Sequence, residues 1–234
     1  MILPIGDDQI KGGYFPLFSY GLIIANVLVF IYQATLSPES FQVFVTTYGS
    51  IPKEIMSSQD LFTLGTSMFL HGSWMHLLGN MLFLWIFADN IEATIGNFRF
   101  LVFYILGGLA AHAAHIYFNI GSEIPTVGAS GAISAVMGAY LVMYPTSRIK
   151  MLVLFFVSRI PAFIFLGVWI AQQWMFGTES LQNITGEGGG VAWWAHIGGF
   201  IFGVLAGAYF RANFPKPQPR SGPLAGRDYS GELL

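Results

Sequence analysis

Six long stretches of this 234-residue chain contain no Asp, Glu, Lys or Arg. They lie between Lys11 and Glu39, Asp60 and Asp89, Arg99 and Glu123, Glu123 and Arg148, Arg159 and Glu179, and Glu187 and Arg211. Each contains 19 or more uncharged residues, and an α-helix needs about 20 apolar residues to cross a bilayer. Only 9% of the residues are charged, against about 25% in a typical soluble domain. The pattern therefore predicts an all-α membrane protein.

We predict one transmembrane helix in each stretch, at residues 17–36, 67–88, 98–118, 128–144, 160–176 and 192–211. Residues 15–211 would then form a single six-helix core. Residues 1–14 are expected to be a short cytoplasmic segment, and the proline-rich, polar residues 212–234 a disordered cytoplasmic tail. The aromatic segment 37–66 is expected to lie in the outer leaflet. The short apolar run 151–157 is expected to form an interfacial turn on the inner side.

Basic residues predict the orientation, because Lys and Arg accumulate in cytoplasmic loops. With the N-terminus inside, the inner segments contain nine of the ten basic residues and the outer segments contain only Lys53. Both termini are therefore expected in the cytoplasm. The chain shows no transit or signal-peptide pattern, which favours a bacterial plasma membrane over an organelle. The net charge of −2 gives no reason to expect a nucleic-acid partner.

A serine and a histidine stand out within these apolar stretches. Ser130 lies near the start of the fourth predicted helix, and His196 lies near the start of the sixth. The two helices run in the same direction, so both side chains are expected at a similar depth below the outer surface. Polar groups at membrane depth are costly and usually functional. The depth match makes a Ser–His pair geometrically possible.

Small residues on both helices would allow this pair to form. Gly199 and Gly203 follow His196 along one face of the sixth helix, and Gly131 follows Ser130 on the fourth. Such small-residue stripes let transmembrane backbones approach closely. Each stripe alone is equally consistent with simple packing, and the shared depth favours the catalytic interpretation.

Other polar residues suggest a supporting role. His76 and Asn80 are four residues apart on one face of the second helix, and could either stabilise a developing oxyanion or join helices. His71 is expected to line the mouth of the site or to bond to the outer loop. His112 and His115 are interpreted as packing or hydrogen-bonding residues, because no membrane carboxylate or cysteine joins them in a metal-binding pattern. We expect no metal and no cofactor.

The sequence offers no third member for a catalytic triad. No carboxylate is placed to reach His196 from within a predicted helix, so serine chemistry would use a dyad in which packing or a neutral partner holds the histidine. The surroundings of Ser130 also lack the Gly-x-Ser-x-Gly pattern of a hydrolase elbow. The absence of cysteine excludes thiol catalysis.

Together these residues resemble the rhomboid intramembrane serine proteases over about residues 15–211. The resemblance rests on Gly128-Ala129-Ser130-Gly131, His196 with Gly199 and Gly203, His76-x3-Asn80, and Glu92-x3-Gly96. It implies a rhomboid six-helix bundle with Ser130 as nucleophile and His196 as general base. It also implies an oxyanion hole of His76, Asn80 and the Ser130 backbone N–H, with Gly128, Gly131, Gly199, Gly203 and Glu92 as structural residues near the site.

Two features depart from the family pattern. Phe62-Thr63 stands where some members have Trp-Arg in the outer loop, and Ser134 stands where some place an aromatic residue against the histidine. These departures leave open what orients His196.

The sequence thus predicts a serine endopeptidase that cuts single-pass membrane proteins within the bilayer, near its outer face. The cut is expected after a small residue. An inactive rhomboid-like protein that binds membrane clients is the main alternative, and a transporter, which would need charged coupling residues at mid-membrane, is the weaker one. The substrate and the oligomeric state are left open.

Overall fold

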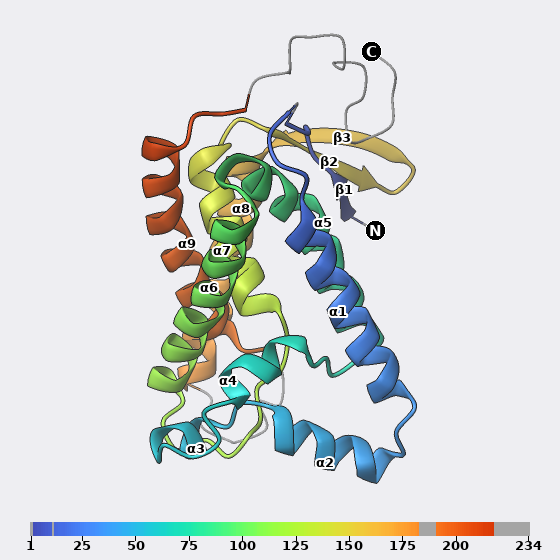
Figure 1. Cartoon of the computed structure of the whole chain (residues 1–234), viewed down its shortest axis with the longest axis vertical. Coiled ribbons are helices and arrows are strands. Elements are labelled where there is room, and N and C mark those ends of the chain that lie inside the picture. The colour runs from blue at the N-terminus through green and yellow to red at the C-terminus, as the bar shows by residue number, and fades with distance from the viewer. Residues whose placement is uncertain (1, 11, 183–190, 218–234) are drawn as a thin grey trace.

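The computed structural model describes residues 2–10, 12–182 and 191–217, which form a mostly helical protein with a small sheet at one end (Figure 1). The longer helices of this part are α1 (Leu17–Ala34), α5 (Trp74–Ile95), α6 (Asn97–Phe118), α7 (Ser130–Met143), α8 (Ala162–Gln182) and α9 (Trp193–Asn213). The shorter ones are α2 (Pro38–Tyr48), α3 (Pro52–Met56), α4 (Thr63–Thr66) and the 3₁₀ helix η1 (Ser67–Phe69). The strands are β1 (Ile2–Gly6), β2 (Arg148–Val153) and β3 (Phe156–Pro161). The predicted tail, residues 212–234, lies largely outside the described residues.

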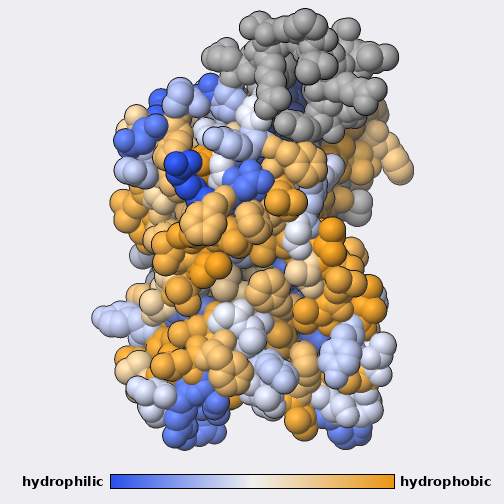
Figure 2. Space-filling model, in the orientation of Figure 1, coloured by the Kyte–Doolittle hydropathy of each residue, from blue (hydrophilic) through white to orange (hydrophobic). Residues whose placement is uncertain are grey.

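Three of these helices, α1, α6 and α9, are long and apolar enough to cross a membrane. α5 and α8 are as long, with 22 and 21 residues, but they contain polar side chains such as Asp89 and Gln173, and α7 has only 14 residues. Figure 2 shows hydrophobic residues across the middle of one face, with hydrophilic residues gathered toward both ends. Length and composition thus identify three spanning helices in the described part, and six crossings remain a prediction.

The second predicted helix had the wrong bounds, because α5 begins and ends seven residues later than 67–88. Ser73 caps its N-terminus by accepting the backbone N–H of His76. The helix ends at Gly96, which has a φ of 88°. Charged residues were assumed to limit the helix, but Asp89 and Glu92 are buried inside α5 with hydrogen-bond partners. A buried carboxylate is tolerated when its oxygens are satisfied in this way.

Glu92 holds the beginning of α1. Its Oε1 accepts the backbone N–H of Phe18 at 2.8 Å, and its Oε2 accepts the N–H and hydroxyl of Ser19 at 2.7 and 2.6 Å. First-turn N–H groups have no intrahelical acceptor and favour a negative charge. Glu92 and His76 are 16 residues apart on α5, which corresponds to about 24 Å along the helix at a rise of 1.5 Å per residue. The expectation that Glu92 lies near the site was therefore wrong, and it joins α1 to α5 instead.

A three-stranded antiparallel sheet, in the order β1-β2-β3, corrects the all-α prediction. The run 151–157, predicted as a turn, forms much of the β2–β3 hairpin. Buried Ile149 and Met151 alternate with exposed Arg148 and half-buried Lys150 along β2, which is the period-two pattern of a strand. The continuous apolar run that follows concealed this alternation.

Asp7 ties the end of β1 to the helices. Its side chain is 1% exposed. Its Oδ2 accepts a hydrogen bond from the Asn90 amide at 2.6 Å and another from the Tyr140 hydroxyl. Burial raises the pKa of Asp7 from 3.8 to about 6, since desolvation disfavours the charged form.

Helix α7 lies at the centre of the bundle, and every residue from Gly131 to Tyr140 is buried. A Cβ added to Gly199 would lie 2.2 Å from the Gly131 carbonyl oxygen, and one added to Gly203 would lie 1.9 Å from that of Ala135. The predicted close approach of these two helices, α7 and α9, is therefore confirmed. The 14 residues of α7 span about 21 Å, less than the roughly 30 Å of a hydrocarbon core.

Candidate active site

Ser130 and His196 meet at the N-terminal ends of α7 and α9. The Ser130 hydroxyl oxygen lies 2.8 Å from His196 Nε2, within the range for a hydrogen bond between a nucleophile and its base. Ser130 is the first residue of α7, so its backbone N–H has no intrahelical acceptor and lies at the positive end of the helix. The imidazole is 8% exposed. The structure therefore places a hydroxyl, a base and a free N–H donor together in a shielded site.

Gln173 on α8 holds the other side of the imidazole. Its Oε1 lies 2.7 Å from His196 Nδ1, and its side chain is 5% exposed. A carboxamide oxygen can only accept a hydrogen bond, so Nδ1 carries the proton and donates it. Nε2 is then unprotonated and can accept the proton of Ser130. Gln173 takes the position that a carboxylate occupies in a triad. It is a neutral partner of the kind that the sequence analysis expected for His196 without naming a residue.

Two tryptophans supply the aromatic contacts that Ser134 cannot. The Trp169 ring, one turn before Gln173 on α8, has its centroid 5.9 Å from that of His196. Trp193 meets the same imidazole edge-on at 6.3 Å. The Ser134 hydroxyl instead donates to the Ser130 carbonyl at 2.7 Å. The sequence analysis missed Trp169 and Gln173, although an uncharged polar residue at membrane depth is the signal that had singled out Ser130.

His76 and Asn80 face the same site from α5. A Cβ built on Gly128 would lie 2.7 Å from His76 Nε2 and 3.6 Å from Asn80 Nδ2. Gly128 has a φ of +124°, so both its conformation and its contact with His76 require glycine. His76 Nδ1 accepts the backbone N–H of Gly72 at 3.5 Å, which leaves Nε2 as a donor. The side-chain donors of His76 and Asn80 thus lie against Gly128, two residues before Ser130 in the chain.

His71 positions Asn80 rather than lining the mouth of the site. It is fully buried, and its Nε2 accepts a hydrogen bond from Asn80 Nδ2 at 2.9 Å. Gln33 on α1 holds the His71 backbone from both sides, with Oε1 accepting its N–H at 3.0 Å and Nε2 donating to its carbonyl at 3.2 Å. Because an amide nitrogen carries two N–H groups, Asn80 keeps a second donor for a ligand.

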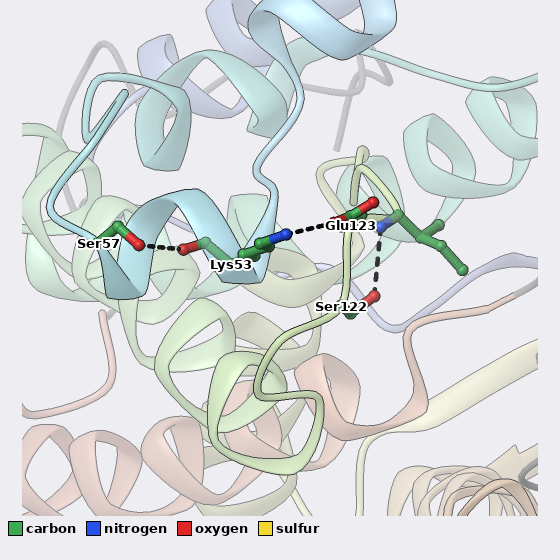
Figure 3. Close-up of polar contacts among 5 residues, drawn as sticks. Lys53, Ser57, Ser122 and Glu123 are labelled. Atoms are coloured by element: carbon green, nitrogen blue, oxygen red, sulfur yellow. Dashed lines mark hydrogen bonds and ion pairs between the residues drawn. The ribbon is translucent and has the colours of Figure 1, made fainter.

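The segment that leads into Ser130 is fastened to the short helices at the far end of the molecule. Ser50 and Thr126 exchange two backbone hydrogen bonds of 3.0 and 2.8 Å. The Lys53 ammonium pairs with Glu123, next to Ser122 (Figure 3). The Lys53 N–H also donates to the Ser122 carbonyl at 3.1 Å. An exposed ion pair contributes little to stability, so the backbone bonds do most of the positioning.

A cavity of about 960 Å³ opens over these groups. Its walls include Ser130, His196, His76 and Asn80, and Trp169, Met137 and Phe83 line its apolar side. Thr126 and Asn119 add polar groups, so the space suits both an extended peptide segment and water. The four predicted site residues therefore share one chamber.

The remaining histidines on α6 have ordinary hydrogen-bond partners. His112 Nε2 lies 3.1 Å from the Ser67 hydroxyl, and His115 Nε2 lies 2.9 Å from that of Thr126. Within the described residues no group of three or more His, Cys, Asp or Glu side chains is arranged to hold a metal ion.

Fold and site together define a helical membrane protein with a serine–histidine pair beneath a cavity. The family model described as "Rhomboid domain" matches residues 58–213, two thirds of the chain. The chain therefore belongs to the rhomboid family, which includes serine intramembrane proteases.

Several curated proteins are similar along most of this chain. Rhomboid protein 1, mitochondrial, of Saccharomyces cerevisiae is 29% identical, covering 89% of this chain and 57% of that protein. Rhomboid protease GluP of Bacillus subtilis is 28% identical, covering 94% and 38%. Presenilin-associated rhomboid-like protein, mitochondrial, of Homo sapiens is 28% identical, covering 79% and 46%. The chain spans between 38% and 57% of the length of these relatives.

Proposed function

We propose that this protein is an intramembrane serine endopeptidase that cleaves transmembrane segments of single-pass membrane proteins. The observation that carries the proposal is the continuous relay from the Gln173 amide through the His196 imidazole to the Ser130 hydroxyl, with contacts of 2.7 and 2.8 Å. The relay faces the cavity, which the side chains of His76 and Asn80 also line. An inactive client-binding protein would need no such alignment.

The proposed reaction begins when Ser130 Oγ attacks the scissile carbonyl carbon and His196 Nε2 takes the hydroxyl proton. The carbonyl oxygen becomes an oxyanion, which the Ser130 N–H, Asn80 Nδ2 and His76 Nε2 stabilise by hydrogen bonds. The imidazolium then gives its proton to the leaving amine, the carbon–nitrogen bond breaks, and an acyl-enzyme remains. Water entering through the cavity hydrolyses the ester, with His196 again acting as the base.

We further propose that all six long helices cross the membrane, with α7 held inside by the others. The basic residues support an orientation with the sheet in the cytoplasm, because Arg148, Lys150 and Arg159 lie in or beside it, whereas Lys53 lies at the opposite end on α3 (Figure 1). Ser130 then opens toward the outer face. The similar proteins come from mitochondria and from a bacterium, so the assignment to a bacterial plasma membrane rests on the sequence pattern alone.

The substrate bond should lie in the outer part of a transmembrane helix. A helical carbonyl is hydrogen-bonded and shielded, so Ser130 can reach it only after the helix opens, which Gly and Pro facilitate. We expect cleavage after Ala, Gly or Ser, because a small side chain beside the scissile bond lets its carbonyl approach Ser130 most closely.

The test is labelling and cleavage by purified protein in proteoliposomes. A fluorophosphonate should label the wild type at Ser130, and Ser130→Ala and His196→Ala should neither be labelled nor cleave a transmembrane reporter. Ser134→Ala, which removes a hydroxyl one turn further along α7, should still be labelled. Folded wild type that is never labelled and cuts nothing would support client binding instead, and residual cleavage by Ser130→Ala would exclude the mechanism.

A further inference from the structure

The tip of the β2–β3 hairpin is apolar and exposed. Leu154, Phe155, Phe156 and Val157 are 63%, 92%, 78% and 59% exposed. In Figure 1 the closed end of the hairpin projects sideways past α5 and α1. Figure 2 shows hydrophobic atoms at that place, at the upper right. Four consecutive exposed apolar residues in a tight turn mark a surface that contacts something apolar.

The two faces of the hairpin differ in chemistry. Ile149 and Met151 are buried against the helices, and Val153 and its cross-strand partner Phe156 continue that face toward the tip. The opposite face carries Lys150, and the cross-strand pair Leu152 and Val157 continues it toward the tip. Both faces of the hairpin are therefore apolar at the tip, and the basic side chains lie nearer the bundle.

The opposite face holds two cations side by side. Lys150 and Arg159 are direct cross-strand partners, and like charges in that position repel. Residues 148–161 contain three basic residues and no carboxylate. The ion pair found among the described residues involves Lys53 and Glu123 at the other end of the molecule. The Asp8 carboxylate accepts the backbone N–H of Arg148 at 3.2 Å, but no described carboxylate forms an ion pair with Lys150 or Arg159. An anionic surface would offset their repulsion.

We propose that the β2–β3 hairpin is an anchor in the headgroup layer of an anionic leaflet, with its apolar tip among the upper acyl chains. The headgroup layer is roughly 5–8 Å deep, close to the thickness of one strand with its side chains. Lys150 and Arg159 can then extend their stems toward lipid phosphates at the water side. This inference rests on the proposed placement of the bundle in the membrane and not on proteolysis.

The hairpin connects α7 to α8. The anchor would therefore hold the connected ends of both helices at a constant depth relative to the leaflet. Because α8 carries Gln173, the leaflet would hold one end of the helix that positions His196. The partner is defined by its chemistry, an apolar layer beneath a negatively charged surface.

Site-directed spin labelling tests this directly, because the chain has no cysteine. A nitroxide is placed at Phe155→Cys on the tip and, as the matched control, at Thr146→Cys on the exposed root. Each protein is reconstituted at one copy per nanodisc, in phosphatidylcholine alone or with one quarter phosphatidylglycerol. We expect the tip label to be several-fold more accessible to oxygen than to a water-soluble nickel chelate, and the root label to show the reverse.

The lipid dependence tests the cations. A basic side chain near an anionic surface strengthens association about fivefold, so phosphatidylglycerol should increase the protection of the tip, and Lys150→Gln/Arg159→Gln should remove that increase. Equal nickel accessibility at tip and root in both lipids would overturn the proposal. Protection that is lost when residues 218–234 are deleted would assign the patch to the tail. Protection that needs two copies per disc, with spin–spin broadening, would assign it to a second chain.

Discussion

Gln173→Leu tests the relay at the residue that the sequence analysis missed. The change removes the acceptor 2.7 Å from His196 Nδ1 while keeping most of the side-chain volume. Gln172 is the matched control, because it is the adjacent amide on α8 and is exposed. Gln172→Leu should therefore leave turnover unchanged.

The expected magnitude follows from the change in charge on His196 during acylation. A hydrogen bond between neutral groups contributes about 0.5–1.5 kcal/mol, and one to a charged group about 1.5–3 kcal/mol. The Gln173 bond therefore strengthens by about 1–1.5 kcal/mol when the imidazolium forms, which alone is about tenfold in rate. Without the acceptor, the proton of His196 is no longer held on Nδ1, so the imidazole can also adopt the tautomer in which Nε2 is protonated and cannot act as the base. We expect kcat to fall about 10- to 100-fold with KM unchanged.

The assay is cleavage of a transmembrane reporter in proteoliposomes under saturating and subsaturating conditions, with thermal unfolding as a check on folding. Gln173→Glu keeps an oxygen acceptor and should recover much of the turnover lost in Gln173→Leu. Wild-type kcat in folded Gln173→Leu would refute the relay. An equal loss in Gln172→Leu would show that the effect belongs to α8 as a whole.

Three further predictions follow from other contacts. Gly199→Val should abolish activity and lower the unfolding temperature in detergent, because the valine side chain would meet the Gly131 carbonyl. Gly167→Ala is the control and should change neither measurement, because no atom lies within 4 Å of the new Cβ. Asn80→Ala should lower kcat about 10²- to 10³-fold with little change in KM; a change in KM alone would reassign Asn80 to packing. Burial raises the pKa of Asp7 to about 6, so its contribution to the free energy of unfolding, which is full below pH 3.8, should be lost progressively up to about pH 6, by up to about 3 kcal/mol; a pH series of melting curves should show this, and Asp7→Asn should remove the part that Asp7 contributes.

Much of the helical architecture could be read from the chain because burial in lipid acts on each segment separately. A spanning helix must satisfy its backbone internally and present apolar side chains, so the uncharged stretches located the long helices. The same rule failed at α5. There Glu92 is buried within a helix because Phe18 and Ser19 of α1 donate hydrogen bonds to it, and no local pattern records those partners. Asp89 is buried beside it and accepts the backbone N–H of Asn90.

The pairing of Ser130 with His196 was predictable for a similar reason. Both lie near the starts of helices that run in the same direction, and glycines on each helix permit contact, so depth and spacing sufficed. The β2–β3 hairpin was not predictable in this way, because its strands gain stability from β1, which comes from the other end of the sequence.

By itself, the sequence located most of the long helices and the residues that carry reactive groups, since these depend on composition and on positions along a single helix. Only the tertiary structure decided what holds His196. Gln173 is 23 residues away on another helix, and Trp169 joins it there because α8 packs beside α9. A side-chain amide within a helix can hydrogen-bond to many different neighbours. The packing of the helices, which depends on contacts among all of them, decides that the partner of Gln173 is the His196 imidazole.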